Sequence, residues 1–203
     1  MIERAAERRL NTRFGNWREI LYRREQREII ALILGEVREE EKVPCRIHSS
    51  CLSAHVLNST ECDCREQMEI AQRYIANYGR GLVIVLDQEG KGNGHRALML
   101  AATMASDQSI SQDEAYRLMG FEPPDRRDYT EAAEVLADLE VSSIELLTNN
   151  PGKEYQLRKA GVSVVSTTQV ALDVELHPQL RRYYDEKAML GHNVHLRPAN
   201  LIG

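Results

Sequence analysis

The sequence lacks any apolar run long enough to cross a lipid bilayer, and it lacks an excess of positive charge. A membrane-spanning helix needs about 20 mostly apolar residues, so we expect no bilayer-spanning segment. Lys and Arg number 26 against 31 Asp and Glu, which gives a net charge of -5. A protein that binds a polyanion generally needs a basic face. Nucleic acid is therefore not an expected partner, although this balance still permits a local basic pocket.

Internal repeats, low-complexity tracts and Pro/Gly/Ser-rich linkers are also missing, and 203 residues suit one substantial domain. The charged start of the chain, Met1 to Arg4, does not resemble a secretory signal peptide. We therefore expect a cytoplasmic protein whose four cysteines stay reduced, because disulfides rarely persist in that compartment. Metal-bound thiolates are the favoured interpretation of these cysteines.

Short apolar runs alternate along the chain with segments of helical periodicity. Strands are expected at 27–37, 43–49, 82–86, 144–147 and 162–165. Helices are expected at 64–78, 97–105, 111–120, 131–139 and 178–191, the third of them with a capping box formed by Ser111 and Glu114. The mostly charged first residues (1–10) are expected to form a loose helical arm before a domain at 11–203. The alternation predicts an α/β or α+β fold, a single domain with a mixed β-sheet flanked by helices.

Three of the four cysteines, Cys51, Cys62 and Cys64, form a C-x10-C-x-C pattern with no obvious fourth ligand. Structural zinc sites usually have four protein ligands, whereas catalytic sites keep three and leave one position for water. On an extended segment residues i and i+2 face the same side, so Cys62 and Cys64 can reach one ion. The pattern predicts a zinc site with hydrolytic chemistry. Three ordinary buried cysteines are the alternative.

Arg46 and His48, which precede the first cysteine, are candidates for the same site. Arg46 and His48 alternate along the strand expected at 43–49. His48 is open to three interpretations: a fourth metal ligand, a hydrogen-bond partner of a ligand, or a packed strand residue. The last two are favoured.

Three polar segments lie at the ends of expected elements. The glycine-rich loop 87–94 follows a strand and suits a phosphate group, or it is a plain glycine turn. In segment 124–129, Asp125 is a candidate base and Arg127 a candidate phosphate ligand; a solvated helix start capped by Asp128 is the alternative. Segment 148–153 follows another strand, where α/β proteins bind ligands, but a simple Asn-Pro turn is slightly favoured there.

Taken together and in this order, these segments resemble the GTP cyclohydrolase II family, whose enzymes catalyse the first step of riboflavin biosynthesis. The match is carried by R-I-H-S-S-C, C-D-C-R-E-Q, Q-E-G-K-G, D-R-R-D-Y and L-L-T-N-N-P-G-K, at 46–51, 62–67, 88–92, 125–129 and 146–153. It covers about residues 11 to 192. The resemblance implies homodimers and the conversion of GTP to a 2,5-diamino-6-ribosylamino-pyrimidinone 5′-phosphate, formate and pyrophosphate.

The resemblance also implies roles for individual residues. Cys51, Cys62 and Cys64 would hold one zinc ion, whose water attacks carbon 8 of the guanine. Residues expected to contact the nucleotide are Arg46, His48, Gln67, Glu89, Gly90, Lys91, Thr148 and Lys153. Asp125 resembles the proposed proton acceptor, and Arg127 matches the arginine proposed to act at the α-phosphate while magnesium-bound pyrophosphate leaves. A guanidinium offers no lone pair, so we expect Arg127 to stabilise developing charge instead.

The chain departs from the family pattern beside the glycine-rich loop. Lys91 stands for the usual arginine, and Leu98 and Ala102 stand for a lysine and a tyrosine in the following helix. His95 is a candidate to replace the missing tyrosine. One alternative is therefore a divergent paralogue that opens a different purine or pyrimidine ring, or stops at a formylated intermediate, in secondary metabolism or nucleobase degradation. Another is a zinc-stabilised binding module without turnover.

Overall fold

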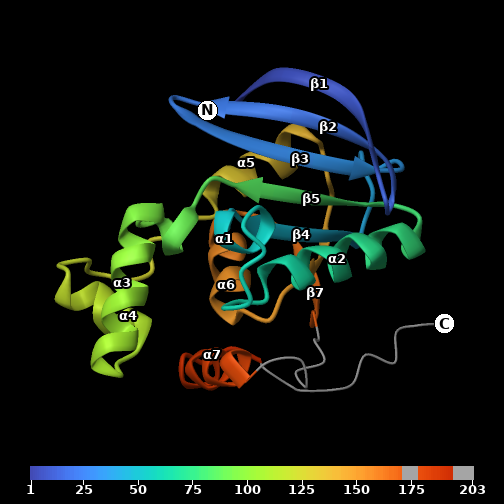
Figure 1. Ribbon diagram of the computed structural model, residues 1–203. Coiled ribbons are helices and arrows are strands. Elements are labelled where there is room, and N and C mark those ends of the chain that lie inside the picture. Colours follow the sequence, from blue (N-terminus) through green and yellow to red (C-terminus); the bar gives the residue numbers. More distant parts are fainter. Residues whose placement is uncertain (171–177, 194–203) are drawn as a thin grey trace.

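A computed structural model describes residues 1–170 and 178–193 of the chain. In these residues seven strands form one mixed sheet in the order β1-β2-β3-β5-β4-β6-β7 (Figure 1). The strands are β1 (Glu3–Thr12), β2 (Gly15–Arg24), β3 (Arg27–Leu34), β4 (Val43–Ser49), β5 (Gly81–Leu86), β6 (Ile144–Leu147) and β7 (Val164–Thr168). Helices flank this sheet, which confirms the predicted α/β single domain.

The direction of the strands decides where a ligand can bind. β4 pairs in parallel with both β5 and β6, and β6 pairs in parallel with β7. The pairs β1–β2, β2–β3 and β3–β5 are antiparallel. The carboxyl ends of β5, β4 and β6 therefore meet at one edge of the sheet, the usual position for ligands in α/β proteins.

The helices cover both faces of the sheet. They are α1 (Leu52–His55), α2 (Cys64–Tyr78), the 3-10 turn η1 (Glu89–Gly92), α3 (His95–Gln108), α4 (Gln112–Leu118), α5 (Thr130–Asp138), α6 (Pro151–Lys159) and α7 (Pro178–Met189). Figure 1 shows α2 in front of the sheet, α5 behind it, and α3 and α4 as a pair to one side. Every helix in the described part of the chain is too short or too polar to span a membrane.

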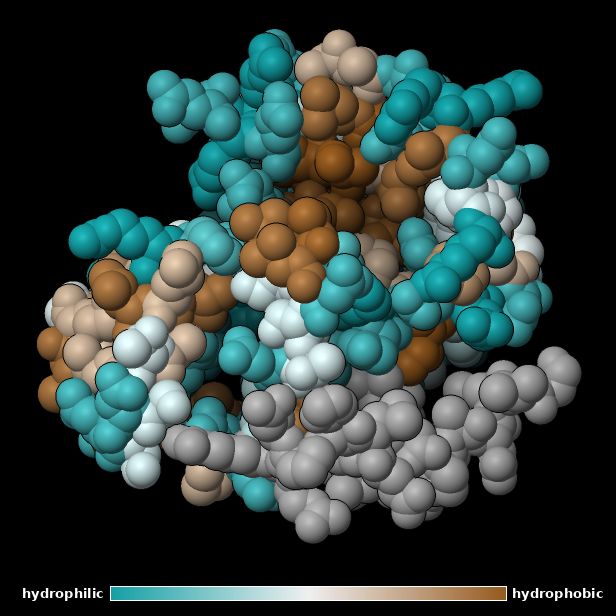
Figure 2. Space-filling model, viewed as in Figure 1, coloured by the Kyte–Doolittle hydropathy of each residue, from teal (hydrophilic) through white to brown (hydrophobic). Residues whose placement is uncertain are grey.

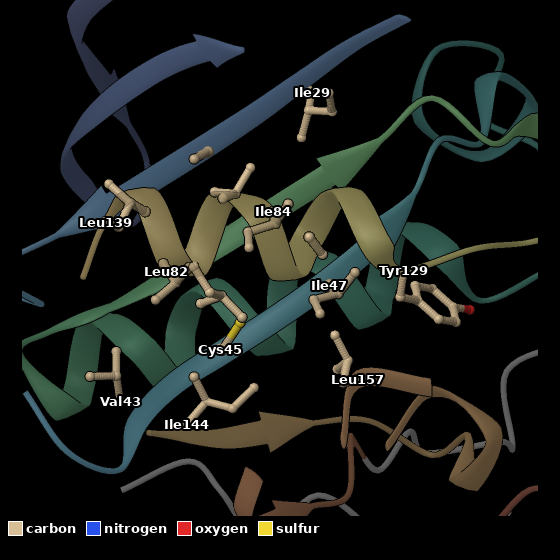
Figure 3. Close-up of a cluster of buried hydrophobic side chains, with 14 of the residues drawn as sticks. Ile29, Val43, Cys45, Ile47, Leu82, Ile84, Tyr129, Leu139, Ile144 and Leu157 are labelled. Atoms are coloured by element: carbon tan, nitrogen blue, oxygen red, sulfur yellow. The ribbon is translucent and has the colours of Figure 1, made fainter. Parts of the chain in front are cut away.

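The side chains of the central strands point alternately into two apolar clusters. Leu82 and Ile84 of β5 pack with Ile47 of β4 against α5 (Figure 3). Val83 packs on the opposite face with Ile75 of α2. Burial of each such side chain contributes about 1.5–3 kcal/mol. The same alternation in β4 leaves its polar residues on the α2 face, where they become part of the site described below.

The expectation of a helical arm at the start of the chain is wrong. β1 pairs with β2 from Glu3↔Arg23 to Thr12↔Gly15, and the side chains of Arg8 and Glu19 form an ion pair across this hairpin. Most side chains of β1 are exposed, so the strand carries no apolar alternation that sequence analysis could detect. Figure 2 shows hydrophilic side chains on either side of an apolar hollow in this part of the molecule. The domain end expected at 203 lies outside the described residues.

Candidate active site

Three of the predicted segments meet where β4, β5 and β6 end. The chain leaves β4 into the first cysteine, β5 into η1, and β6 into α6. Leu52 N donates to Glu89 Oε2 at 2.8 Å, which joins the first cysteine segment to η1. Lys153 Nζ donates to the carbonyl of Ile47 at 2.6 Å, which joins α6 to β4. Segments up to about 100 residues apart in sequence thus form one site.

The three cysteines of the predicted metal site lie together. Their Sγ atoms all fall within 4.8 Å of one another, and Cys51 Sγ lies 3.7 Å from Cys62 Sγ. The convergence was predicted, but its geometry differs from the extended segment expected. Asp63 has φ -99° and ψ 16°, and Cys64 is the first residue of α2. None of the three forms a disulfide.

The three cysteine side chains shift one another's pKa values. Hydrogen bonds from Cys62 and Cys64 lower the pKa of Cys51, and the hydrogen bond to Cys51 raises the pKa of Cys62 and of Cys64. One thiolate is therefore stabilised by two protonated neighbours. A thiophilic cation such as zinc would stabilise all three as thiolates, because metal binding deprotonates its cysteine ligands. The donor set fits zinc.

His48 is not a member of this sulfur cluster. Among the described residues the mutually close metal-ligand atoms belong to the three cysteines only. His48 is buried, and its Nε2 lies 3.0 Å from His55 Nε2. Burial, followed by the charge of Arg46, lowers the pKa of His48 well below its ordinary value. His48 is thus a neutral, packed strand residue beside the cysteines, one of the two interpretations favoured from the sequence.

Arg46 and Gln67, both predicted to contact the substrate, are hydrogen-bonded to each other inside the protein. Arg46 Nη2 donates to Gln67 Oε1 at 2.5 Å, and Arg46 Nη1 donates to the carbonyl of Leu147 at 2.9 Å. Both side chains are buried on the α2 face of the sheet. Burial lowers the pKa of Arg46, while the charge of Asp63 opposes that shift. A guanidinium in this position remains charged and fixed in orientation.

The glycine-rich loop forms η1, a rigid turn. Gly90 and Lys91 both adopt left-handed backbone angles, with φ 60° and 59°. The side chain of Lys91 forms an ion pair with Asp113 of α4. Burial raises the pKa of Glu89, and His95 Nδ1 lies 3.8 Å from its Oε1. The loop is thus fixed to α1, α3 and α4, in contrast to a flexible glycine turn.

Gly90 offers a direct test of this packing. A Cβ added there would lie 3.1 Å from Leu98 Cβ and 3.2 Å from Tyr116 Oη, whereas a Cβ at Gly120 would meet nothing within 4 Å. Both glycines have positive φ. We expect Gly120→Ala to lower the free energy of unfolding by about 1 kcal/mol through backbone strain alone. We expect Gly90→Ala to cost about 1–3 kcal/mol more from overpacking. Urea unfolding followed by Trp17 fluorescence measures both, and equal losses would contradict the prediction.

Asp125 and Arg127 form a bidentate pair just before α5. Arg127 Nε donates to Asp125 Oδ1 at 2.9 Å, and Arg127 Nη2 lies 2.5 Å from Asp125 Oδ2. Burial opposes ionisation of Asp125, but the hydrogen bonds and charge of Arg127 outweigh it and lower the pKa of that carboxyl. Asp128 Oδ1 accepts from Thr130 N at 2.9 Å, as expected of a residue at a helix start. The predicted catalytic pair is therefore a fully charged ion pair.

The segment after β6 begins a helix. Asn150 Oδ1 accepts from Gly152 N at 2.9 Å and caps α6, so the expected Asn-Pro turn is also a helix start. Thr148 Oγ1 accepts from Asn150 N at 3.1 Å. Lys153 is buried, and burial followed by Arg46, Arg127 and Lys187 lowers its pKa well below the ordinary value. Lys153, Arg46, Arg127 and Lys187 form a basic cluster, which a net charge of -5 still permitted.

Sequence reasoning did not identify four residues at this site. Tyr116 is fully buried, and its hydroxyl has no hydrogen-bond partner in the described part of the chain. Asp63 is a buried carboxylate. Lys187 lies in α7 and His192 just after it. Burial, followed by the charge of Lys187, lowers the pKa of His192 to about 4. Both residues lie within the stretch that the family resemblance covers, which was the one signal available for them.

Near the site lie several apolar residues and the positions at which the chain departs from the family pattern. Leu52, Val56 and Leu57 are exposed, and Figure 2 shows an apolar patch at the position of α1. Leu98 lies beside Gly90, and Ala102 follows it one turn later in α3. Leu98 thus gives η1 an apolar neighbour in α3. Lys91, the third departure, points to Asp113.

Comparison with known proteins gives matches over nearly the whole chain. A family model described as GTP cyclohydrolase II matches residues 3–169. GTP cyclohydrolase-2 of Histophilus somni strain 2336 is 36% identical over 205 residues, which cover 99% of this chain and 93% of that protein. GTP cyclohydrolase-2 of Pasteurella multocida is 36% identical, with 94% of this chain and 87% of that protein covered.

Some relatives are longer. The riboflavin biosynthesis protein RibBA of Chlamydia muridarum is 35% identical over 95% of this chain, but the match spans only 45% of that protein. The chain thus spans about half the length of such relatives. Among solved structures, RibBX, a two-domain 3,4-dihydroxy-2-butanone 4-phosphate synthase from A. baumannii, matches 82% of this chain and 40% of its own at 17% identity and a TM-score of 0.46. That likeness is too low to support an argument.

Proposed function

Because the chain belongs to the GTP cyclohydrolase II family, we propose that it is a zinc-dependent cyclohydrolase that opens the imidazole ring of GTP. The products would be a 2,5-diamino-6-ribosylamino-pyrimidinone 5′-phosphate, formate and pyrophosphate. One observation carries the proposal: three cysteine sulfurs lie within 4.8 Å of one another at the strand edge that also holds the basic cluster. A hydrolytic centre beside several cations suits a nucleoside triphosphate.

Cys51, Cys62 and Cys64 would hold the zinc ion, which when bound lowers the pKa of water to about 7 and supplies a nucleophile at neutral pH. Glu89, whose carboxylate is fixed by the backbone of Leu52 beside the first cysteine, offers acceptors to the N–H groups of a guanine edge. Gln67 and Arg46 add an amide and a guanidinium that are hydrogen-bonded to each other. These residues would orient the base.

The remaining polar residues would act on the phosphates. Arg127 would supply positive charge and Lys153 a hydrogen-bond donor, since burial lowers the pKa of its amino group. Magnesium would accompany the substrate phosphates. Arg127 would stabilise charge developing at the α-phosphate, since a guanidinium cannot act as a nucleophile. Asp125 would hold that guanidinium in place and accept a proton. Thr148 and His48 would complete the walls, and the proposal includes a cytoplasmic homodimer.

Product analysis tests this proposal. Zinc-loaded protein is incubated with GTP and magnesium, and the products are identified by mass spectrometry. Formate, pyrophosphate and the diaminopyrimidinone phosphate are the expected result. Unconverted GTP, with zinc content verified, would overturn the assignment of GTP as substrate.

A second function is favoured by the η1 side of the site. Leu98 gives η1 an apolar neighbour in α3, and the ammonium of Lys91 is already paired with Asp113. A site with these features suits a divergent paralogue that opens another purine or pyrimidine ring, or stops at the formylated intermediate. The same assay with other nucleotides and free nucleobases separates the two functions, because clean GTP conversion at ordinary rates would eliminate the paralogue.

A further inference from the structure

The C-terminal helix α7 lies outside the segment that the family model matches, which ends at residue 169. It nevertheless packs against the site. In Figure 1, α7 lies near α6 and the start of α2, on the side away from the β1–β2 hairpin. Asn193 N, just beyond α7, donates to the carbonyl of Asn149 at 3.0 Å and ties this end of the chain to the loop after β6.

The contact centres on Asp63, a carboxylate between two cysteines of the sulfur cluster. Tyr184 Oη donates to Asp63 Oδ2 at 2.8 Å, and Lys187 Nζ donates to Oδ1 at 3.1 Å. The side chain of Asp63 is completely buried. Its two oxygens accept hydrogen bonds from three side chains, those of Gln67, Tyr184 and Lys187. Asp63 is thus the point at which α7 and α2 are joined.

The hydrogen bonds continue from Asp63 into the proposed substrate site. Gln67 Nε2 donates to Asp63 Oδ2 at 2.6 Å. Since the nitrogen of the amide is held by the carboxylate, its oxygen must face Arg46, whose Nη2 donates to it at 2.5 Å. Asp63 therefore fixes which way the amide of Gln67 points and, through it, the orientation of Arg46.

α7 also adds positive charge to the basic cluster. Lys187 Nζ lies 4.2 Å from the centroid of the Tyr183 ring, so its position is fixed by the ring and by Asp63. Its charge contributes to the lowered pKa of both Lys153 and His192. An ammonium has three donors. One bonds to Asp63 and the ring covers another side, which leaves one donor for an anion.

We propose that α7 is a working part of the site: Lys187 is a binding residue for the substrate's phosphate groups, and Asp63 is a positioning residue that transmits the docking of α7 to Gln67 and Arg46. This inference rests on the proposed function for the identity of the substrate. The phosphate contact itself does not, because any oligophosphate presents the same oxyanions.

Binding of inorganic tripolyphosphate to the zinc-loaded protein, measured by titration calorimetry, tests the first part. Lys187→Met is expected to weaken binding about tenfold to a hundredfold, the size of one charge-assisted hydrogen bond. Lys187→Arg should retain most of the affinity. The control is Asp185→Asn, on an exposed position of the same helix, which should bind as the wild type does. Affinity of Lys187→Met within twofold of the wild type would overturn the phosphate contact.

The second part is tested by combining Asp63→Asn with Lys187→Met. Residues that act through one network are not additive, so the double variant should bind GTP, measured by titration calorimetry, about as weakly as the more affected single variant. Losses that multiply would refute the network. In turnover assays Asp63→Asn should raise KM for GTP more than it lowers kcat. Urea unfolding of each sample by Trp17 fluorescence separates a folding defect from a positioning defect.

The assignment of GTP as substrate and the role of α7 can be tested independently of each other. If the wild type binds tripolyphosphate through Lys187 but leaves GTP unchanged, the inference about α7 stands and the assignment of GTP fails. If GTP is converted and Lys187→Met binds and turns over like the wild type, the cyclohydrolase assignment stands and the role of α7 fails.

Discussion

Replacement of Cys62 by serine is expected to abolish zinc binding and to reduce turnover at least about a thousandfold, while the protein remains folded. A serine hydroxyl is a much poorer zinc ligand than a thiolate, and two thiolates cannot close the site. The fold does not depend on these sulfurs, because they lie at the end of the sheet, outside both large apolar clusters. A zinc-stabilised binding module predicts the opposite: the same substitution would unfold the protein.

The fourth cysteine provides the matched control. Cys45 is fully buried in the cluster between β4 and α5 (Figure 3), and burial raises the pKa of its thiol to about 12. Cys45→Ser would bury an unpaired hydroxyl and lower the free energy of unfolding by about 1–3 kcal/mol, with zinc content and turnover nearly unchanged. Zinc content by atomic absorption and melting temperature, with and without a chelator, should separate the two variants. Unfolding of the wild-type protein in the presence of a chelator would instead show that the metal is structural.

Replacement of Arg127 by methionine is expected to lower kcat about 10²–10³-fold, the loss typical when a charge-stabilising donor is removed from a transition state. The substitution removes the partner that holds Asp125 in a bidentate pair at 2.9 and 2.5 Å. Because the pKa of Asp125 is lowered by Arg127, its carboxyl should titrate at higher pH in the variant. The acid limb of the pH–rate profile should therefore move to higher pH.

Arg127→Lys distinguishes the two roles proposed for this residue. Electrostatic stabilisation predicts partial activity, since lysine keeps the charge but loses the planar fork. A covalent nucleophilic role predicts a trappable phosphoramidate adduct in the wild type, and its detection by mass spectrometry would contradict the electrostatic role. The control is Arg126→Met, because Arg126 is exposed and its guanidinium lies 5.2 Å from the Phe121 ring centroid. Its kcat should stay within about twofold of the wild type.

Several elements were predictable because their signals are local. The apolar run before Asp87 became β5, and the segment 43–49 became β4 with the predicted bounds. Ser111 Oγ accepts from Glu114 N at 3.1 Å, as the capping pattern required. These signals depend on neighbours within a few residues, so the sequence shows them directly.

Other elements depended on distant partners. β1 is almost entirely exposed and exists because β2 pairs with it. The buried state of Asp63 depends on donors in α7, more than 120 residues later in the chain. Composition and periodicity contain no record of such pairs, because backbone ladders and buried ion pairs form only after the elements pack.

The sequence by itself determined the chemistry available to this protein. Its residue types and spacing indicated a three-cysteine metal site, a candidate base in Asp125, a candidate phosphate ligand in Arg127, and an α/β sheet with polar segments at its strand ends. Only the tertiary structure decided how these groups are held: Lys91 is paired with Asp113, Gln67 is oriented by Asp63, and α7 contributes Lys187. The physical reason is that a side chain's identity fixes its donors and charge, whereas its partners are fixed by the parallel strands and helices that surround it.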